Sequence, residues 1–143
     1  MNIEHVDQKS TEELKASLTS VPSINEVSND ILSNALIVKD DGVIIGAVSY
    51  EKYNKNALIR YFVFKKTIDD EVVISLFKAL EESARNDGIS LLYCVVNSLL
   101  IEELFNRLGF CKKEGSKLYI DEELFDLSKN NQAFIMEKEL FVY

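Results

Sequence analysis

Hydrophobic and polar residues follow two different periods along this chain, and the period changes several times. A period of two residues predicts a strand, and a period of 3.6 residues predicts an amphipathic helix. Residues 11–33 are predicted to be helical in two pieces, because Pro22-Ser23 interrupts the pattern. The remaining pattern predicts helices over 71–87 and from 97–98 to about 108, and strands over 35–39, 43–53, 57–64, 89–96, 110–120 and 133–141.

Turn and cap residues lie between most of these segments. Asp41-Gly42 predicts a tight hairpin, because glycine adopts a positive φ without a steric cost. Thr11, with Glu12-Glu13 behind it, is expected to begin the first helix, and Asp69 or Asp70 the long one. Asp87-Gly88 and Gly109 are expected to end helices, whereas the acidic segment 121–131 is interpreted as a loop or a short helix.

The order of the elements predicts an α/β fold. The strand, helix and strand across 57–96 imply a right-handed crossover and a parallel pair of strands at the centre of the sheet. The strands over 35–64 form an antiparallel meander before it, and helices are expected on both faces. The length of 143 residues, without a repeat or a linker, predicts a single domain over 1–143.

Charge and cysteine content exclude several classes of function. Sixteen Lys and Arg against 24 Asp and Glu give a net charge of −8, so binding to nucleic acid or to an anionic membrane is not expected. The longest stretch without charge, 88–101, is shorter than the roughly 18 apolar residues of a membrane span. The first residues lack the pattern of a signal peptide, and Cys94 and Cys111 form no CxxC motif. The protein is therefore expected to be cytoplasmic with reduced thiols, and a Cys94–Cys111 disulfide is left open.

Three segments resemble the GNAT N-acetyltransferase superfamily. Residues 89–97, ISLLYCVVN, are similar to the fifth strand of that family and its trailing asparagine. LFNRLGF at 104–110 resembles the end of its last helix, and FIMEKEL at 134–140 its last strand. The resemblance implies a mixed, mainly antiparallel sheet of about six to seven strands, with helices on both faces and a central parallel pair.

The resemblance also implies a place for acetyl-CoA. In the family the cofactor lies between the fourth and fifth strands, where pantetheine pairs with backbone groups that here belong to Tyr61, Phe62 and Val63. Asn97 matches a position whose side chain often contacts the cofactor, although a helix cap together with Ser98 explains it equally well. The cofactor-binding residues implied are therefore Phe62, Val63 and Asn97.

The loop that binds pyrophosphate departs from the family pattern. The family has Gln/Arg-x-x-Gly-x-Gly/Ala at the start of the third helix, whose free N–H groups and partial positive charge attract phosphate. This chain has Ile68-Asp69-Asp70-Glu71-Val72-Val73 there. Carboxylates at a helix start stabilise the helix but repel phosphate, so a capped helix explains these residues better than a cofactor site. Lys65 and Lys66 precede the loop and compensate only in part.

The catalytic positions of the family are also altered. The tyrosine that often serves as general acid corresponds to Phe105, and the fourth strand carries Arg60 but no carboxylate. Glu51 and Tyr119 are the candidate catalytic residues, with Tyr61 and Tyr93 as further substitutes, and the sequence does not select among them. His5 is the sole histidine and is expected at the surface, so no metal site is predicted.

Two hypotheses follow for the function. The first is an acetyl-CoA-dependent N-acetyltransferase acting on an unidentified small-molecule or peptide amine, which the acidic charge predicts to be cationic. The second is a non-catalytic protein of the same fold that has lost acetyl-CoA binding and serves as a ligand- or protein-binding module. A homodimer is compatible with the resemblance, because proteins of the family are frequently dimers.

Overall fold

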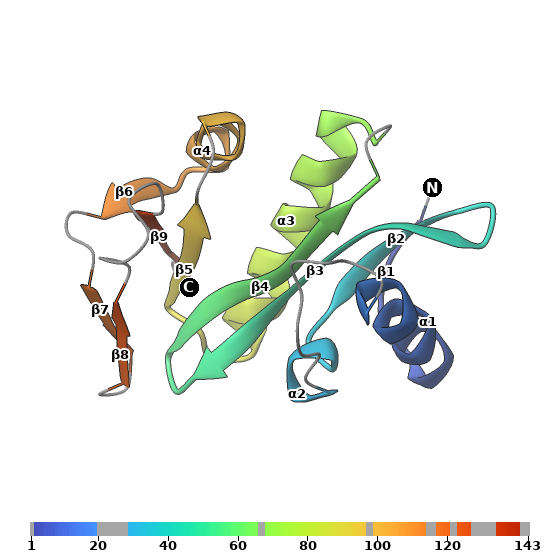
Figure 1. Cartoon of the computed structure of the whole chain (residues 1–143), viewed down its shortest axis with the longest axis horizontal. Coiled ribbons are helices and arrows are strands. Elements are labelled where there is room, and N and C mark those ends of the chain that lie inside the picture. Colours follow the sequence, from blue (N-terminus) through green and yellow to red (C-terminus); the bar gives the residue numbers. More distant parts are fainter. Residues whose placement is uncertain are drawn as a thin grey trace. The chain divides into compact units, whose positions relative to one another are not determined.

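The structure is a computed structural model that describes residues 2–19, 29–65, 68–96, 99–113, 117–120, 123–126 and 134–140 (Figure 1). Among these residues, seven strands form one sheet in the order β1-β2-β3-β4-β5-β9-β6, and β7 and β8 form a second. The mixed, mainly antiparallel sheet with helices on both faces is therefore confirmed. The elements are β1 (Asn2–His5), α1 (Gln8–Thr19), α2 (Asn29–Leu32), β2 (Leu36–Asp40), β3 (Val43–Tyr53), β4 (Asn56–Phe64), α3 (Asp70–Asn86), β5 (Leu91–Val96), α4 (Leu99–Arg107), β6 (Cys111–Lys113), β7 (Lys117–Ile120), β8 (Glu123–Asp126) and β9 (Phe134–Glu139).

The chain is organised into two compact units. Unit 1 comprises Met1–Glu51 and Arg60–Ser83, and unit 2 comprises Lys52–Ile59 and Ala84–Tyr143. The strand β4 contributes its first residues to unit 2 and its last residues to unit 1, and α3 likewise extends over both. The single domain expected from the length stays a prediction, and each unit is described separately below.

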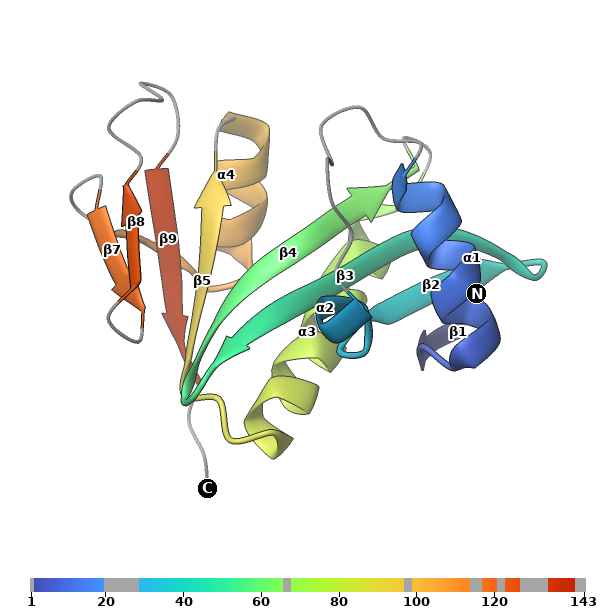
Figure 2. The same ribbon diagram turned by 60° about the horizontal axis from the view of Figure 1, so that its bottom comes forward.

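In unit 1, helices cover both faces of the strands. Figures 1 and 2 show α1 and α2 on one face and α3 on the other. The first face is held by a buried apolar cluster, to which α1 contributes Leu14 and α2 contributes Leu32. On the second face the rings of Phe62 and Phe64 contact Phe77 of α3, with centroids 5.2 and 6.5 Å apart. The alternation of side chains along β4 therefore supplies both layers.

The first helix begins earlier than the sequence predicts. Asp7, not Thr11, is its cap: the Ser10 backbone N–H donates to Asp7 Oδ1 at 2.8 Å, and the Asp7 N–H donates to Ser10 Oγ at 2.8 Å. This reciprocal pair is a capping box with serine in place of the usual glutamate. The usual motif is therefore absent from the sequence at this point, and the acidic pair Glu12-Glu13 favoured Thr11 instead. The hydrogen bonds from Ser10 lower the pKa of the Asp7 carboxyl.

The central hairpin and the long helix agree closely with the predicted elements. β3 has the predicted bounds, and the turn before it has Asp41 at φ 50° and Gly42 at φ 76°, as the hairpin signal predicts. The long helix α3 begins one residue earlier than predicted, and Gly88 follows its end at φ 82°. The strand β1 was not predicted, because four largely exposed residues are too short to show a period.

Unit 2 contains the predicted parallel pair. Asn56–Leu58 of β4 pair in parallel with Leu91–Tyr93 of β5, and β9 pairs antiparallel with β5 and with β6. Two predictions about the last third of the chain are wrong. Residues 110–120 are not one strand, because β6 joins the large sheet while β7 pairs with β8. Residues 121–131 are not only a loop or a helix, because they contain the strand β8. The polar run from 112 to 117 marks the break between β6 and β7.

Candidate functional site

The predicted cofactor-binding residues of β4 lie on opposite faces of the strand. Val63 is half-buried and packs against the apolar cluster under α1. Phe62 is half-buried on the α3 face, where its ring lies edge-on to Phe64 with centroids 4.6 Å apart. Both side chains are therefore used in packing, so a cofactor at this strand would be bound by the backbone of these residues.

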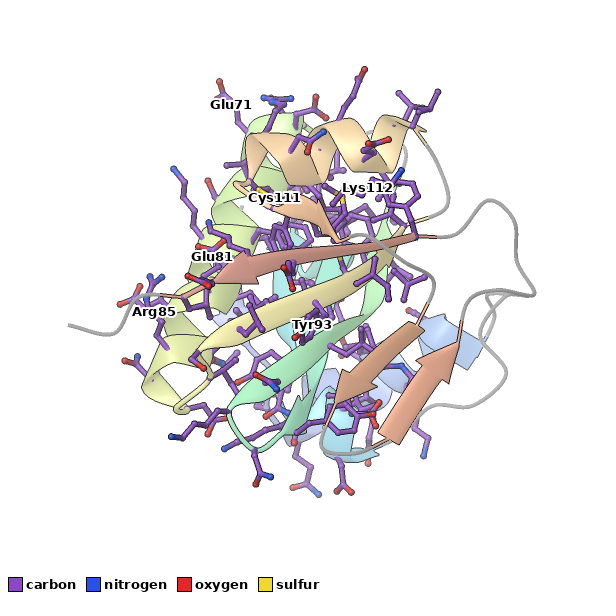
Figure 3. The ribbon with its side chains drawn as sticks, turned by 90° about the vertical axis from the view of Figure 1, so that its left-hand side faces the viewer. Glu71, Glu81, Arg85, Tyr93, Cys111 and Lys112 are labelled. Carbon is purple, nitrogen blue, oxygen red and sulfur yellow. The ribbon has the colours of Figure 1, made fainter. Side chains whose placement is uncertain are left out.

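The start of α3 is closed by side chains of the chain itself. The Glu71 backbone N–H donates to Asp69 Oδ1 at 3.1 Å. The Asp69 carbonyl accepts the backbone N–H groups of Val72 at 3.0 Å and of Val73 at 3.2 Å, which begins the helix. Asp69, Asp70 and Glu71 are all exposed, and Figure 3 shows Glu71 directed outward at this end of α3. Asp69 is therefore the helix cap, as the sequence predicts.

Ile68 replaces a cation of the family pattern with an apolar contact. Its backbone N–H donates to the Lys65 carbonyl at 3.1 Å, and its side chain is half-buried. A methyl group added at Gly46 of β3 would lie 3.2 Å from Ile68 Cδ1 and 2.6 Å from Phe64 Cδ1. Gly46 thus leaves space on the α3 face that Phe64 and Ile68 fill.

These residues do not fit the pyrophosphate of acetyl-CoA. A phosphate at a helix start needs backbone N–H groups that face it and a positive local potential. Here the carboxylate of Asp69 holds the Glu71 N–H, two further carboxylates flank it, and Ile68 packs against the sheet. Unit 1 therefore carries a capped helix start in the place where the family binds the diphosphate.

The candidate general base Glu51 is held in an ion pair. Its Oε2 atom accepts a hydrogen bond from Arg60 Nη1 at 2.5 Å, across the hairpin of β3 and β4. A carboxylate beside a guanidinium is stabilised in its ionised form and is a weaker base. Arg60 was expected only as a charge on β4, so its pairing with Glu51 was not predicted. The turn at residues 54–55 was the available signal, because a hairpin brings the two residues onto one face.

The other candidate residues lie in unit 2 or outside the described residues. Tyr119 belongs to β7, where it pairs with Leu124 of β8, and its side chain is not among those described. Asn97, implied as a cofactor contact, lies outside the described residues, and so does the side chain of Tyr61. The roles expected of Tyr119 and Asn97 therefore stay predictions.

Two aromatic residues of unit 2 are part of its packing. Phe105 of α4, which stands where the family often has a tyrosine, is buried, and its ring lies edge-on to Phe110 with centroids 5.0 Å apart. Tyr93 of β5 is buried beside Leu58 and Ile135. Burial, followed by the charge of Glu137, raises the pKa of its phenol, which makes it a poorer proton donor.

Metal-binding clusters and membrane-spanning helices are both absent from the residues that the structure describes. These residues contain no group of three or more His, Cys, Asp or Glu side chains that could hold a metal ion. His5 is exposed on the edge strand β1. None of the described helices is long and apolar enough to cross a membrane.

No family model matches the sequence, and no curated protein matches it. The structure, however, is similar to solved acetyltransferase structures. The Mycobacterium tuberculosis protein Rv2747, in complex with CoA and NLQ, matches with a TM-score of 0.77 at 12% identity, over 99% of this chain and 100% of that one. The putative acetyltransferase YncA of Salmonella typhimurium, with acetyl-CoA, matches with a TM-score of 0.70 at 14% identity, over 100% and 95%.

A larger enzyme contains the same fold as one part. N-acetylglutamate synthase of Neisseria gonorrhoeae, in complex with coenzyme A and N-acetyl-glutamate, matches with a TM-score of 0.72 at 17% identity. The match covers 99% of this chain, which spans about a third (35%) of the synthase. At these identities the likeness concerns the fold. The chain therefore has the fold of the GNAT N-acetyltransferase superfamily, as its sequence motifs led us to expect.

Proposed function

We propose that this protein is a ligand-binding module of the GNAT fold that does not use acetyl-CoA. The observation that carries the proposal is the hydrogen bond from the Glu71 backbone N–H to the Asp69 carboxylate. In the family that helix start receives the pyrophosphate of the cofactor, and here a carboxylate of the chain occupies the same donor.

Electrostatics at this helix start favours the same conclusion. Asp69, Asp70 and Glu71 are exposed and lie within one turn of the first N–H groups of α3. Two like charges 4 Å apart repel each other by about 1 kcal/mol in water, and by more where water is excluded. The three carboxylates and the diphosphate would therefore oppose each other, while each carboxylate stabilises the helix dipole.

The second candidate is an acetyl-CoA-dependent N-acetyltransferase. The specific support for it is that two solved structures containing CoA or acetyl-CoA match nearly the whole length of this chain. Its cofactor would rest on the backbone at Phe62 and Val63, with Asn97 beside it. Its acceptor would be a cationic amine, such as a polyamine, an aminoglycoside or a lysine side chain, because the net charge is −8.

Calorimetric titration with acetyl-CoA separates the two candidates. The proposal expects no saturable heat up to millimolar acetyl-CoA for the natural sequence. Micromolar saturation, with amide shifts at Phe62 and Val63, would overturn the proposal and favour the enzyme. A cytoplasmic location and a homodimer remain predictions on either candidate.

A repaired variant tests the cause of the loss. Ile68→Arg, Glu71→Gly and Val73→Ala restore the family pattern, and Asp69→Ala removes the carboxylate that holds the Glu71 N–H. Alanine is chosen at position 73 because the Val73 side chain is buried. We expect this quadruple variant to gain acetyl-CoA binding. Glu12→Lys with Glu13→Gln, at exposed positions of α1, is the matched control, because it changes the net charge by the same amount at a distant helix. If the control gains binding equally, net charge and not the loop is responsible.

A further inference from the structure

Unit 1 contains a pocket on the α1 face of its strands. It has a volume of about 170 Å³ and lies between α1 and the strands β3 and β4. Leu14 and Ser17 line it from the helix and residues 44–46 from β3. Val63 and Phe64 line it from β4, and Lys65 lines it directly after that strand. Figure 2 shows α1 over these strands, on the face opposite to α3. The pocket therefore lies on the α1 face of the strands, and Phe62, which packs on the α3 face, does not line it.

The pocket is mainly apolar. Leu14 is buried at its base, and the half-buried Ile44 and Val63 pack against the cluster that contains Leu14. An apolar cavity of about 150 Å³ in a protein is large enough to bind benzene, so the volume here suits a single aromatic ring. The natural occupant of such a pocket is a small apolar group that is removed from water.

Lys65 gives the rim of the pocket a positive charge. Its backbone N–H donates to the Ile45 carbonyl at 2.9 Å, which continues the pairing of β3 and β4 by one residue. Because side chains alternate along a strand, Lys65 lies on the same face as Val63, toward α1. Lys65 is exposed, so its ammonium group is available to an anion at the mouth of the pocket.

We propose that this pocket binds a small aromatic carboxylate, with the ring inside and the carboxylate paired with Lys65. The inference rests on the proposed function, since it supplies the class of ligand for the binding module. The pocket shares Val63 with the cofactor-binding residues that the resemblance implies, but its other wall is α1, and its proposed ligand carries no diphosphate. An ion pair of this kind fixes the orientation of the ligand, and the ring supplies most of the affinity.

The first experiment uses 3-phenylpropanoate as the probe on the full chain. Titration followed by backbone amide shifts is expected to saturate and to move the signals of Ile44, Val63 and Lys65. 3-Phenylpropanamide has the same shape without the charge, and acetate has the charge without the ring. We expect the amide to bind about fivefold more weakly and acetate not to saturate. Equal binding of acid and amide would overturn the role of Lys65.

Variants then test the position of the site. Lys65→Gln is expected to weaken the binding of 3-phenylpropanoate about fivefold. Lys78→Gln, which changes an exposed lysine of α3, is the matched control and is expected to leave this binding unchanged. Ser17→Phe fills the pocket from its rim and is expected to abolish binding while the unfolding midpoint stays close to that of the natural chain. The inference is overturned if 3-phenylpropanoate still binds the Ser17→Phe variant. It is also overturned if the natural chain does not bind 3-phenylpropanoate at millimolar concentration. The acetyl-CoA titration tests the proposed function independently, so the two failures are distinguishable.

Discussion

The carboxylate of Asp69 and the backbone N–H of Glu71 are joined by a hydrogen bond of 3.1 Å at the start of α3. The same donor cannot serve both a cap and a phosphate. Stability of α3 and affinity for a diphosphate therefore compete at this point, and this chain has the residues that favour stability. This competition predicts that removal of the Asp69 carboxylate lowers the stability of α3.

Removal of this cap is expected to destabilise the fold. Asp69→Ala leaves the Glu71 N–H without its side-chain acceptor and is expected to lower the free energy of unfolding by about 1 kcal/mol. Urea unfolding followed by circular dichroism measures this difference. Asp69→Asn is the matched control, because asparagine caps helices about as well as aspartate and is expected to retain most of the stability. Equal losses in the two variants would mean that charge, not capping, accounts for the effect.

Much of the fold was accessible from sequence because local signals agreed with one another. The strand β3 was predicted with its bounds, since alternation of residue types met a strong turn at Asp41-Gly42. The division of residues 110–120 into β6 and β7 was not predicted, because pairing partners decide it. β6 pairs with β9, which lies more than 20 residues further along the chain. Long-range pairing of short strands leaves almost no local pattern.

The candidate site was only partly accessible from sequence. Residues 68–73 differ from the pyrophosphate pattern that the resemblance implies, and helix chemistry offered Asp69 or Asp70 as the cap. The pairing of Glu51 with Arg60 and the space that Gly46 leaves depend on side-chain positions across two strands. Such relationships arise from the register of the hairpin and are absent from any single segment.

Gly46 is expected to be required for packing on the α3 face. A methyl group there would lie 2.6 Å from Phe64 Cδ1, which is closer than carbon atoms approach without displacement. Because the Phe64 ring is confined by Phe62 and Phe77, Gly46→Ala is expected to cost about 1–3 kcal/mol of unfolding free energy. The measurement is urea unfolding, repeated in a Phe64→Leu background. Leucine at position 64 has no ring and should reduce the cost of Gly46→Ala. An unchanged cost would show that the Phe64 ring is not the obstacle.

The pair formed by Glu51 and Arg60 is expected to contribute little to stability. The two side chains retain 28% and 45% of their exposure, so solvent screens the attraction. A double-mutant cycle with Glu51→Gln and Arg60→Met is expected to give a coupling energy below about 1 kcal/mol that decreases with added salt. A coupling above that value and insensitive to salt would indicate a desolvated pair and contradict the exposed geometry.

The two cysteines are expected to differ in reactivity. Both are free thiols; Cys111 is exposed on β6 (Figure 3), and Cys94 is buried in β5. Iodoacetamide should therefore modify Cys111 in the native protein and both residues in denaturant, as mass spectrometry can show. Cys111→Ser is expected to remove native labelling altogether. Rapid native labelling of Cys94 would mean that β5 is accessible to the reagent.

Burial of Cys94 is also expected to make stability depend on pH in the alkaline range. Burial raises the pKa of its thiol far above the ordinary value of 9.0, so the folded chain keeps the proton that the unfolded chain releases. The stability is thus complete below pH 9 and decreases as the pH rises above it. Between pH 8 and 10 this residue should account for a loss of about 1.4 kcal/mol.

The measurement is the free energy of unfolding in urea at pH 8 and at pH 10. In Cys94→Ala the decrease in unfolding free energy from pH 8 to pH 10 is expected to be smaller by about 1.4 kcal/mol. The loss of packing lowers the stability of this variant at both pH values. Cys111→Ala is the matched control: its thiol is exposed in the folded state, so the alkaline decrease should equal that of the natural chain. If Cys94→Ala leaves the decrease unchanged, Cys94 ionises in the folded chain as readily as in the unfolded one.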